Sequence, residues 1–371
     1  MAQRLARVRA SAADAQAVTV AALRQDGACI VEGMFDCTTI ATMRASVLRK
    51  AERDAGTDAR PGSASQGYIP SADVLTEQAP DWISEFVGVN TVRFSSLGSI
   101  GGVETRDAYF RMLDNPLYKG VADDILLPFS GTYWVNTAQA MLIGPNSPAQ
   151  PLHRDADNWS QMFERTWAGS QTPDLTVSAI IALEEVTAEM GATRLVLGSN
   201  RDGSPGSSHE DNAKSEAEAV AAANGGNPDY NKNWAAEAVA AELQPGDAVI
   251  YSGSVLHAGG ANTTRDRWRV AMHLSFVVGW LTPEEASPLD YTTAELEECG
   301  ASDHVRQVLG HRSYDPSHTR NPIGQPGGGG GLWLRHVRKI EDYVFSGEGT
   351  EAGPRLRTVE EGGGRGTQSK L

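Results

Sequence analysis

A series of strand-like segments in the middle of the chain constrains the fold more than any other feature. Each segment is rich in β-branched, aromatic and other apolar residues, and turn-forming residues separate one segment from the next. The segments are residues 133–143, 175–183, 194–197, 248–251 and 268–278. Short strands divided by turns are typical of a β-sandwich or β-barrel. We therefore expect a mainly β fold whose β core covers residues 130–280.

Helices are expected on both sides of this β region. Their periodicity and composition predict helices at 12–24, 38–55, 114–127, 293–309 and 332–345, together with one short strand at 28–31. A polar insert at 200–241, with an Ala/Glu-rich helical part, interrupts the strands and is typical of a lid or surface excursion. Residues 346–371 are expected to form a flexible tail. The sequence thus predicts a single domain over 1–345 with flanking helices.

The charge of the chain disfavours several kinds of partner. Lys and Arg number 32 and Asp and Glu number 47, which gives a net charge of −15 with neutral histidines. This acidic balance argues against nucleic acids and anionic membranes as partners. No apolar run approaches the ~20 residues that cross a bilayer. Three cysteines without metal-type spacing favour a reducing compartment.

His153 and Asp155 form the strongest signal of a functional site. Two residues at i and i+2 point to the same side of an extended strand, so both side chains could bind one metal ion. A second histidine, His257, follows 104 residues after His153. Two histidines and one carboxylate on one side of an ion match the facial triad of non-haem Fe(II) oxygenases, which leaves positions open for an oxidant and O₂. The alternative interpretation is that His153 is an ordinary loop histidine that forms a hydrogen bond with Asp155.

An arginine at the start of the last strand adds to this signal. Arg269 follows His257 by twelve residues. An arginine that faces the inside of a barrel is costly unless it meets an anion, and its planar group suits a carboxylate. Arg265 and Arg267 compete for this role, but they are expected in the loop before the strand. His273, in the middle of the same strand, is interpreted as a packed or surface histidine.

The sequence resembles the phytanoyl-CoA dioxygenase family of Fe(II)/2-oxoglutarate-dependent oxygenases, in particular its fungal members of secondary metabolism. The resemblance covers about residues 23–280. It lies in Asp-Gly-Ala-Cys-Ile-Val at 26–31, Gln-Pro-Leu-His-Arg-Asp at 150–155, Met-Gly-Ala-Thr-Arg-Leu-Val-Leu-Gly-Ser-Asn at 190–200, His-Ala-Gly-Gly-Ala-Asn at 257–262 and Arg-Val-Ala-Met at 269–272.

This resemblance implies a fold and a set of roles. The family fold is a double-stranded β-helix, or jelly roll. His153, Asp155 and His257 would hold Fe(II), and Arg269 would bind the distal carboxylate of 2-oxoglutarate. The cosubstrate-binding positions of the family match Gln150 and Thr193. O₂ would be the second cosubstrate. Asn200 stands where the family usually has a histidine. By this resemblance, Asp155 is the carboxylate ligand of the oxygenases, which the related halogenases replace with a small residue.

The substrate is much less constrained by the sequence. Candidate residues of a substrate pocket are Tyr133, Trp134, Asn136, Asn158 and Trp159. Hydroxylation, desaturation, rearrangement and endoperoxide formation are all open outcomes. We expect the substrate to be a polycyclic or peptide-derived secondary metabolite, because the sequence contains no clear cluster of Lys and Arg that could bind the phosphates of coenzyme A. A fatty acyl-CoA 2-hydroxylase and a metal-binding jelly roll without turnover are the alternatives.

The last three residues suggest a cellular address. Ser369, Lys370 and Leu371 form the peroxisomal import tripeptide, which an import receptor reads at a free C-terminus. The expected location is the peroxisome if the source is eukaryotic and the cytoplasm otherwise. A homodimer is also compatible with the sequence.

Overall fold

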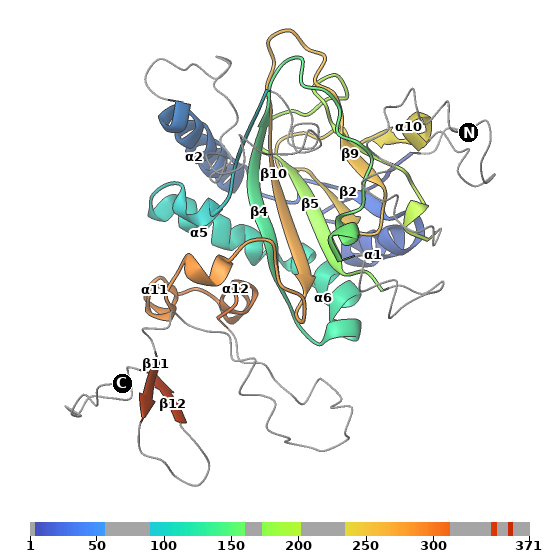
Figure 1. The fold of residues 1–371 in the computed structure, drawn as a ribbon. Helices are drawn as coiled ribbons and strands as arrows, with labels where there is room; N and C mark the ends of the chain where they lie inside the picture. Colours follow the sequence, from blue (N-terminus) through green and yellow to red (C-terminus); the bar gives the residue numbers. More distant parts are fainter. Residues whose placement is uncertain are drawn as a thin grey trace. The chain divides into compact units, whose positions relative to one another are not determined.

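The chain divides into two units, residues 1–285 and 286–371. The computed structural model in Figure 1 describes residues 4–55, 90–159, 173–201, 234–311, 343–346 and 355–358. The β core and every candidate residue for metal or cosubstrate binding belong to the first unit. The described helices include none that is both long and apolar enough to cross a membrane.

A seven-stranded sheet forms the centre of the first unit (Figure 1). Its order is β1 (Ala6–Arg9), β2 (Ala28–Glu32), β8 (Ala248–Ser252), β5 (Thr176–Ala182), β10 (Arg269–Val278), β4 (Tyr133–Ile143) and β3 (Thr91–Phe94). Only β1 and β2 run parallel among these pairs. The structure confirms the strands expected at 28–31, 133–143, 175–183, 248–251 and 268–278, whereas β1 and β3 were not anticipated.

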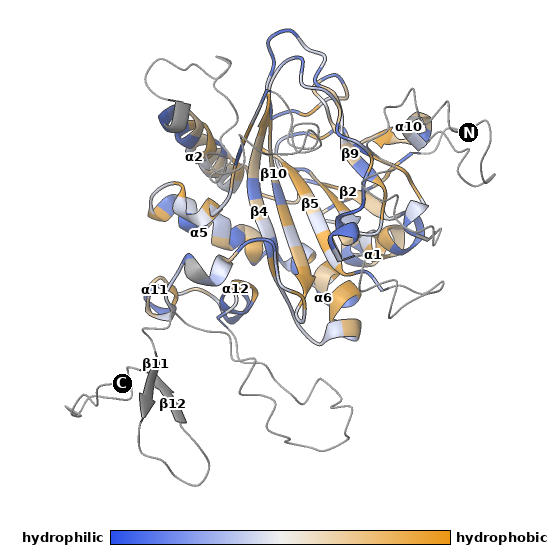
Figure 2. Cartoon of the chain, in the orientation of Figure 1, coloured by the Kyte–Doolittle hydropathy of each residue, from blue (hydrophilic) through white to orange (hydrophobic). Residues whose placement is uncertain are grey.

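A second, three-stranded sheet consists of β7 (Val239–Ala240), β6 (Thr193–Leu195) and β9 (His257–Gly259). One buried apolar cluster joins the two sheets, because it contains Met141, Ile180 and Ala271 of the large sheet together with Leu195 of the small one. Two facing antiparallel sheets closed around one core make a double-stranded β-helix, which confirms the expected mainly β fold. Figure 2 shows mostly apolar strands in the large sheet and hydrophilic loops at their ends.

Helices cover the outer face of the large sheet. They are α1 (Ala15–Asp26), α2 (Cys37–Ala55), α5 (Val103–Leu113) and α6 (Pro116–Ser130). α1 lies against β2 and β8, α6 lies against β5, β10 and β4, and α5 packs on α2. The buried Tyr118 of α6 donates its hydroxyl to the carbonyls of Val177 and Leu274, at 2.9 and 2.7 Å. This contact ties α6 to two neighbouring strands.

The ends of these helices follow local residue chemistry. Gly27 ends α1 in a left-handed conformation with φ +82°, which costs glycine little. α6 begins at Pro116 because Asn115 caps it by accepting a hydrogen bond from the backbone N–H of Tyr118. The helix expected at 114–127 is therefore confirmed with shifted ends, and α5 precedes it as a separate helix that the sequence analysis missed.

The second unit corrects two expected helices. The segment 293–309 forms two short helices, α11 (Thr293–Glu298) and α12 (Asp303–Val308), because Gly300 adopts φ +68° and Ser302 caps a new helix. They follow the short 3₁₀ helix η5 (Ser287–Leu289). The end of the expected helix 332–345 is instead strand β11 (Tyr343–Ser346), paired with β12 (Arg355–Thr358) inside the expected tail.

Parts of the expected organisation lie outside the described residues. Most of the polar insert does so, from 202 to 233, with its expected helical part; its described ends form η3 (Ser199–Arg201) and α10 (Trp234–Glu237). The C-terminal tripeptide lies outside them as well. Two further 3₁₀ helices, η1 (Leu97–Ser99) and η2 (Asp155–Trp159), belong to the first unit.

Candidate metal centre

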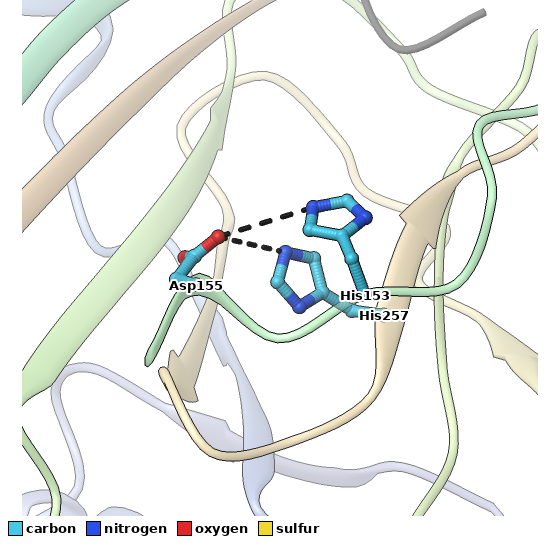
Figure 3. A group of neighbouring side chains, drawn as sticks. All are labelled: His153, Asp155 and His257. Carbon is cyan, nitrogen blue, oxygen red and sulfur yellow. Dashed lines mark ion pairs between the residues drawn. The ribbon is translucent and has the colours of Figure 1, made fainter. Parts of the chain in front are cut away.

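His153, Asp155 and His257 point toward one another (Figure 3). Nε2 of His257 lies 3.3 Å from Oδ1 of Asp155, and Nε2 of His153 lies 3.9 Å from the same oxygen. One ligand atom from each residue lies within 4.8 Å of the other two. Two imidazole nitrogens and a carboxylate oxygen at this spacing can bind one transition-metal ion on one of its sides.

Backbone pairing positions the two histidines. His153 and His257 form an isolated antiparallel bridge in which each backbone N–H donates to the other's carbonyl at 2.9 Å. Residues directly opposite one another across a bridge project their side chains to the same face. Asp155 is positioned differently from our expectation. It begins the 3₁₀ helix η2, so the carboxylate arrives from a turn and not from a continuous strand.

Backbone carbonyls select the ring nitrogen that each histidine presents. Nδ1 of His153 lies 2.9 Å from the carbonyl of Pro151, and Nδ1 of His257 lies 3.1 Å from that of Val255. A carbonyl can only accept, so each Nδ1 carries a hydrogen, and in the neutral imidazole each Nε2 keeps its lone pair. Both Nε2 atoms face Asp155, which is the arrangement that a bound metal needs.

Burial and mutual charge set the protonation of the centre. Burial, reinforced by His257, lowers the pKa of His153 to about 4, which keeps this imidazole neutral. For Asp155, burial raises the pKa, but the neighbouring His257 outweighs it and holds the pKa below its ordinary value. Burial lowers the pKa of His257, but Asp155 raises it further, and the net shift is upward. The centre therefore combines an ionised Asp155 and a neutral His153 with a His257 whose protonated form Asp155 stabilises, and metal binding would displace that proton from Nε2.

Polar side chains of the large sheet form hydrogen bonds that hold Asp155 in place. The hydroxyl of Ser178 on β5 donates to Oδ2 of Asp155 at 3.2 Å and lies 2.9 Å from Oγ of Ser275 on β10. The ring of Tyr251 packs 4.6 Å from that of His257, and its hydroxyl lies 3.3 Å from Nε2 of His273. His273 is thus a packed histidine near the centre, which is one of the two interpretations that the sequence allowed.

Arg269 is buried on the inner face of the sheet. Arg269 is 2% exposed, and one Nη donates to the carbonyl of Gly191, while its Nε has no hydrogen-bond partner in the part of the chain that the structure describes. Burial, together with the charge of Arg93, lowers its pKa to about 9. By contrast Arg267 is half exposed and pairs with Glu185 at 3.0 Å. Of these two arginines, Arg269 is the one that requires an anion.

A second cation, the half-buried Arg93, was missed by the sequence analysis. The register of β3, β4 and β10 places Arg93 opposite Met141 and Met141 opposite Ala271, two residues along from Arg269 and on the same face. Its Nε is buried and has no hydrogen-bond partner among the described residues, and desolvation lowers its pKa to about 10. Its position within the short strand β3 offered no sequence signal. Two uncompensated arginines fit a ligand that carries a carboxylate.

The comparison with known families agrees with this arrangement. The family model described as phytanoyl-CoA dioxygenase matches residues 23–271. The chain belongs to the phytanoyl-CoA dioxygenase family. The expected resemblance over about 23–280 is thereby confirmed.

Curated relatives in fungi extend this result. Dioxygenase FrzG of a Cladobotryum species is 30% identical over 263 residues, which are 67% of this chain and 76% of the relative. Dioxygenase trt7 of Aspergillus terreus is 33% identical over 242 residues, 64% of this chain and 70% of the relative. The iron/alpha-ketoglutarate-dependent dioxygenase penM of Penicillium thymicola is 28% identical over 176 residues, 47% of each chain.

Solved structures match more distantly. AviO1 from Streptomyces viridochromogenes is 16% identical, covers 72% of this chain and 97% of its own, and has a TM-score of 0.45. The epimerase SnoN, solved in complex with Fe³⁺, alpha ketoglutarate and nogalamycin RO, is 18% identical, covers 71% of this chain and 84% of its own, and has a TM-score of 0.42.

The two further cosubstrate candidates of this family member meet at one glycine. Oε1 of Gln150 accepts the backbone N–H of Gly259 at 2.8 Å. Thr193 begins β6, lies opposite Gly259 in the register of β6 and β9, and is 5% exposed. Both residues therefore lie next to Gly259, which is two positions after His257 on β9. Their contact with the cosubstrate remains a prediction.

Two of the five expected pocket residues form contacts within the protein. Tyr133 is 1% exposed, its hydroxyl donates to Asp123 of α6 at 2.8 Å, and its ring packs 5.1 Å from that of Phe276. Trp134 is buried and donates Nε1–H to the carbonyl of Leu281 at 3.0 Å. A contact of either side chain with the substrate stays a prediction.

The two asparagines of the expected pocket converge on a residue that the sequence analysis missed. Nδ2 of Asn136 and Nδ2 of Asn158 each donate to Oε1 of Glu284 at 2.9 Å. Trp159, next to Asn158, is partly exposed at the end of η2. The signal for Glu284 was weak, because it is one of two adjacent glutamates after the last strand.

Proposed function

We propose that this chain is an Fe(II)- and 2-oxoglutarate-dependent dioxygenase that oxidises a small organic molecule and releases succinate and CO₂. One observation carries the proposal: a two-histidine, one-carboxylate centre lies on the same inner side of the fold as two arginines, Arg93 and Arg269, whose buried Nε atoms have no hydrogen-bond partner among the described residues. The family match and the iron/alpha-ketoglutarate-dependent relative support the same chemistry.

The residues present fit both groups. His153, Asp155 and His257 would hold Fe(II), and Arg269 with Arg93 would hold the carboxylate of 2-oxoglutarate. When bound, iron and 2-oxoglutarate supply the O₂ activation that oxidises a substrate C–H bond. The protein contributes fixed Nε2 donors, an ionised Asp155 and buried positive charge, all set in place by backbone pairing before any ligand binds.

We propose a secondary metabolite, polycyclic or peptide-derived, as the substrate. Coenzyme A carries several phosphates, and a chain with a net charge of −15 attracts such an anion poorly unless a local basic site compensates. The two buried arginines are already required for 2-oxoglutarate. The acyl-CoA 2-hydroxylase remains the second candidate, and a substrate panel with succinate detection would separate the two.

The test of the reaction class is succinate formation by protein loaded anaerobically with Fe(II) and then given O₂ and 2-oxoglutarate. His153→Ala and His257→Ala should each reduce this activity by more than about 100-fold, because a two-ligand site holds iron weakly. Glu52→Gln, on the exposed side of α2, serves as the matched control. Normal turnover in either histidine variant would contradict the assignment, and a metal-binding jelly roll would show no O₂ uptake.

We also propose peroxisomal import through Ser369, Lys370 and Leu371, which requires a free carboxylate at Leu371 and a eukaryotic source. Removal of the three residues should disperse a punctate tagged protein. An unchanged distribution would contradict this proposal. Whether the chain forms a homodimer is measurable by its mass in solution.

A further inference from the structure

Glu284 is a second carboxylate near the metal centre, and it is not one of the metal ligands. Glu284 follows β10, and its Oε1 accepts hydrogen bonds from Asn136 and Asn158, both at 2.9 Å. Asn136 also accepts the backbone N–H of Glu284 through Oδ1 at 3.1 Å. Three hydrogen bonds thus hold this one glutamate in place. Glu284 nevertheless reaches solvent, so a ligand can approach it.

The geometry of η2 places Glu284 on the side of the metal ligands. Asp155 and Asn158 lie three residues apart in this 3₁₀ helix, and residues at i and i+3 of a 3₁₀ helix lie above one another on one face. Because Asn158 donates to Glu284, the glutamate lies on the face that also carries Asp155. Desolvation by the surrounding protein raises the pKa of Glu284, and the negative charge of Asp155 adds to this increase.

A bulge in β4 adds a second polar group at this place. The register of β4 against β10 shifts at Asn136, so that Val135 and Thr137 pair with the adjacent residues Phe276 and Ser275. Bulges re-aim side chains and are frequent beside active sites. Thr137 lies opposite Ser275, whose neighbour Ser178 bonds Asp155. The hydroxyl of Thr137 is buried and has no hydrogen-bond partner in the part of the chain that is described.

Charge indicates what this carboxylate binds. Asn136 and Asn158 both donate to Oε1, which leaves Oε2 for a ligand. Among the described residues no Lys or Arg forms an ion pair with Glu284. An exposed carboxylate that two amide groups hold in place can accept a charge-assisted hydrogen bond from a cation that brings its own donor.

We propose that Glu284 determines substrate specificity by binding a protonated nitrogen of the substrate through Oε2, beside the metal centre. This inference rests on the proposed dioxygenase function and narrows its substrate class to basic, nitrogen-containing molecules. Thr137 offers a second hydrogen-bonding group to the same ligand. An anionic ester such as an acyl-CoA is disfavoured, because its charge would meet both Glu284 and the net negative charge of the protein.

The test uses the full chain with Mn(II) in place of Fe(II) and with 2-oxoglutarate present. Three probes of similar shape are compared by the paramagnetic relaxation of their protons: tryptamine, N-acetyltryptamine and indole-3-propionate. We expect tryptamine to show about ten-fold more relaxation per bound Mn(II) than indole-3-propionate, with N-acetyltryptamine in between. In Glu284→Gln this preference should fall to about two-fold or less, because the amide keeps the shape and removes the charge.

Glu52→Gln is the matched control, because it removes an exposed glutamate from α2 without touching the site, and it should keep the native preference. Equal relaxation by the three probes, or an unchanged preference in Glu284→Gln, would overturn the inference. Equal relaxation by tryptamine and its acetyl derivative would show that charge is not recognised and would overturn it too. Failure of the native chain to bind Mn(II) or to form succinate would instead reject the proposed function.

Discussion

At the scale of single residues, this site is defined by ring nitrogens of two histidines that face one carboxylate and by arginine Nε atoms that have no hydrogen-bond partner among the described residues. Nδ1 hydrogen bonds to backbone carbonyls leave Nε2 of His153 and His257 available. The Nε atoms of Arg269 and Arg93 are buried and have no hydrogen-bond partner among the described residues. Nearly every buried polar group in a protein finds a partner, so exceptions that share one face point to a ligand. Function at this scale therefore depends on what the protein leaves unpaired.

The first prediction concerns Arg269. Arg269→Met should raise the KM for 2-oxoglutarate by about 100-fold, which corresponds to roughly 3 kcal/mol for a lost buried charge-assisted contact. It should leave folding stability unchanged or higher, since an uncompensated buried cation is removed. Arg267→Met, which removes a half-exposed arginine from the neighbouring loop, is the control. An unchanged KM in Arg269→Met would show that another group binds the cosubstrate.

The second prediction concerns the pH response of a buried thiol. Burial raises the pKa of Cys29 from 9.0 to about 11, whereas Cys37 is exposed. At pH 8 about one Cys29 thiol in a thousand is ionised, so iodoacetamide should modify Cys37 and spare Cys29 until the protein unfolds. The raised pKa also means that the stability contributed by the neutral thiol is full below pH 9.0 and is lost as the pH rises through about 11.

Mass spectrometry of the alkylated peptides measures the rates at both cysteines. Modification of Cys29 at the rate of Cys37 in native protein at pH 8 would contradict the buried environment.

At the level of elements, short segments of the small sheet set the positions of the ligands. β9 begins with His257, β6 begins with Thr193, and the turn before β6 brings Gly191 to Arg269. Gly191 has φ +84°, and a Cβ there would lie 2.5 Å from the carbonyl oxygen of Gly260. The turn can approach β9 this closely only because both of these residues lack a side chain.

The third prediction tests that approach. Gly191→Ala should cost about 3 kcal/mol or more of unfolding free energy, because backbone strain and a clash with backbone act together. It should also raise the KM for 2-oxoglutarate, since the carbonyl that orients Arg269 moves. Gly33→Ala is the matched control: φ is +63°, but nothing lies within 4 Å of the added Cβ. Its cost should be about 1 kcal/mol.

Urea unfolding measures both variants. Equal destabilisation by the two substitutions would mean that the clash at Gly191 relaxes without cost, contrary to this prediction.

At the level of the whole molecule, the first unit joins metal ligands from distant parts of the sequence. His153 and His257 are separated by 104 residues and meet because the chain closes two sheets around one core. An unfolded chain does not hold the three ligands together, so metal binding favours the folded state of this unit. Ligand binding and folding are therefore linked.

The fourth prediction follows from this linkage. Mn(II) with 2-oxoglutarate, each at about 100 times its dissociation constant, should stabilise the protein by at least about 2.7 kcal/mol. For a chain of this size the melting temperature should rise by roughly 5 °C. The rise should disappear with a chelator and in His257→Ala. Calorimetry measures it, and an equal rise in His257→Ala would place the metal elsewhere.

The sequence by itself determined most strands of the large sheet, the ligand residue types and the family, because periodicity, turn residues and motifs are local properties. It therefore identified β4, β5, β8 and β10 as well as His153, Asp155, His257 and Arg269, whereas it missed β1 and β3. Only the tertiary structure brought in Arg93 and Glu284. These two assignments depend on strand register and on contacts between segments far apart in the chain, and neither leaves a local pattern in the sequence.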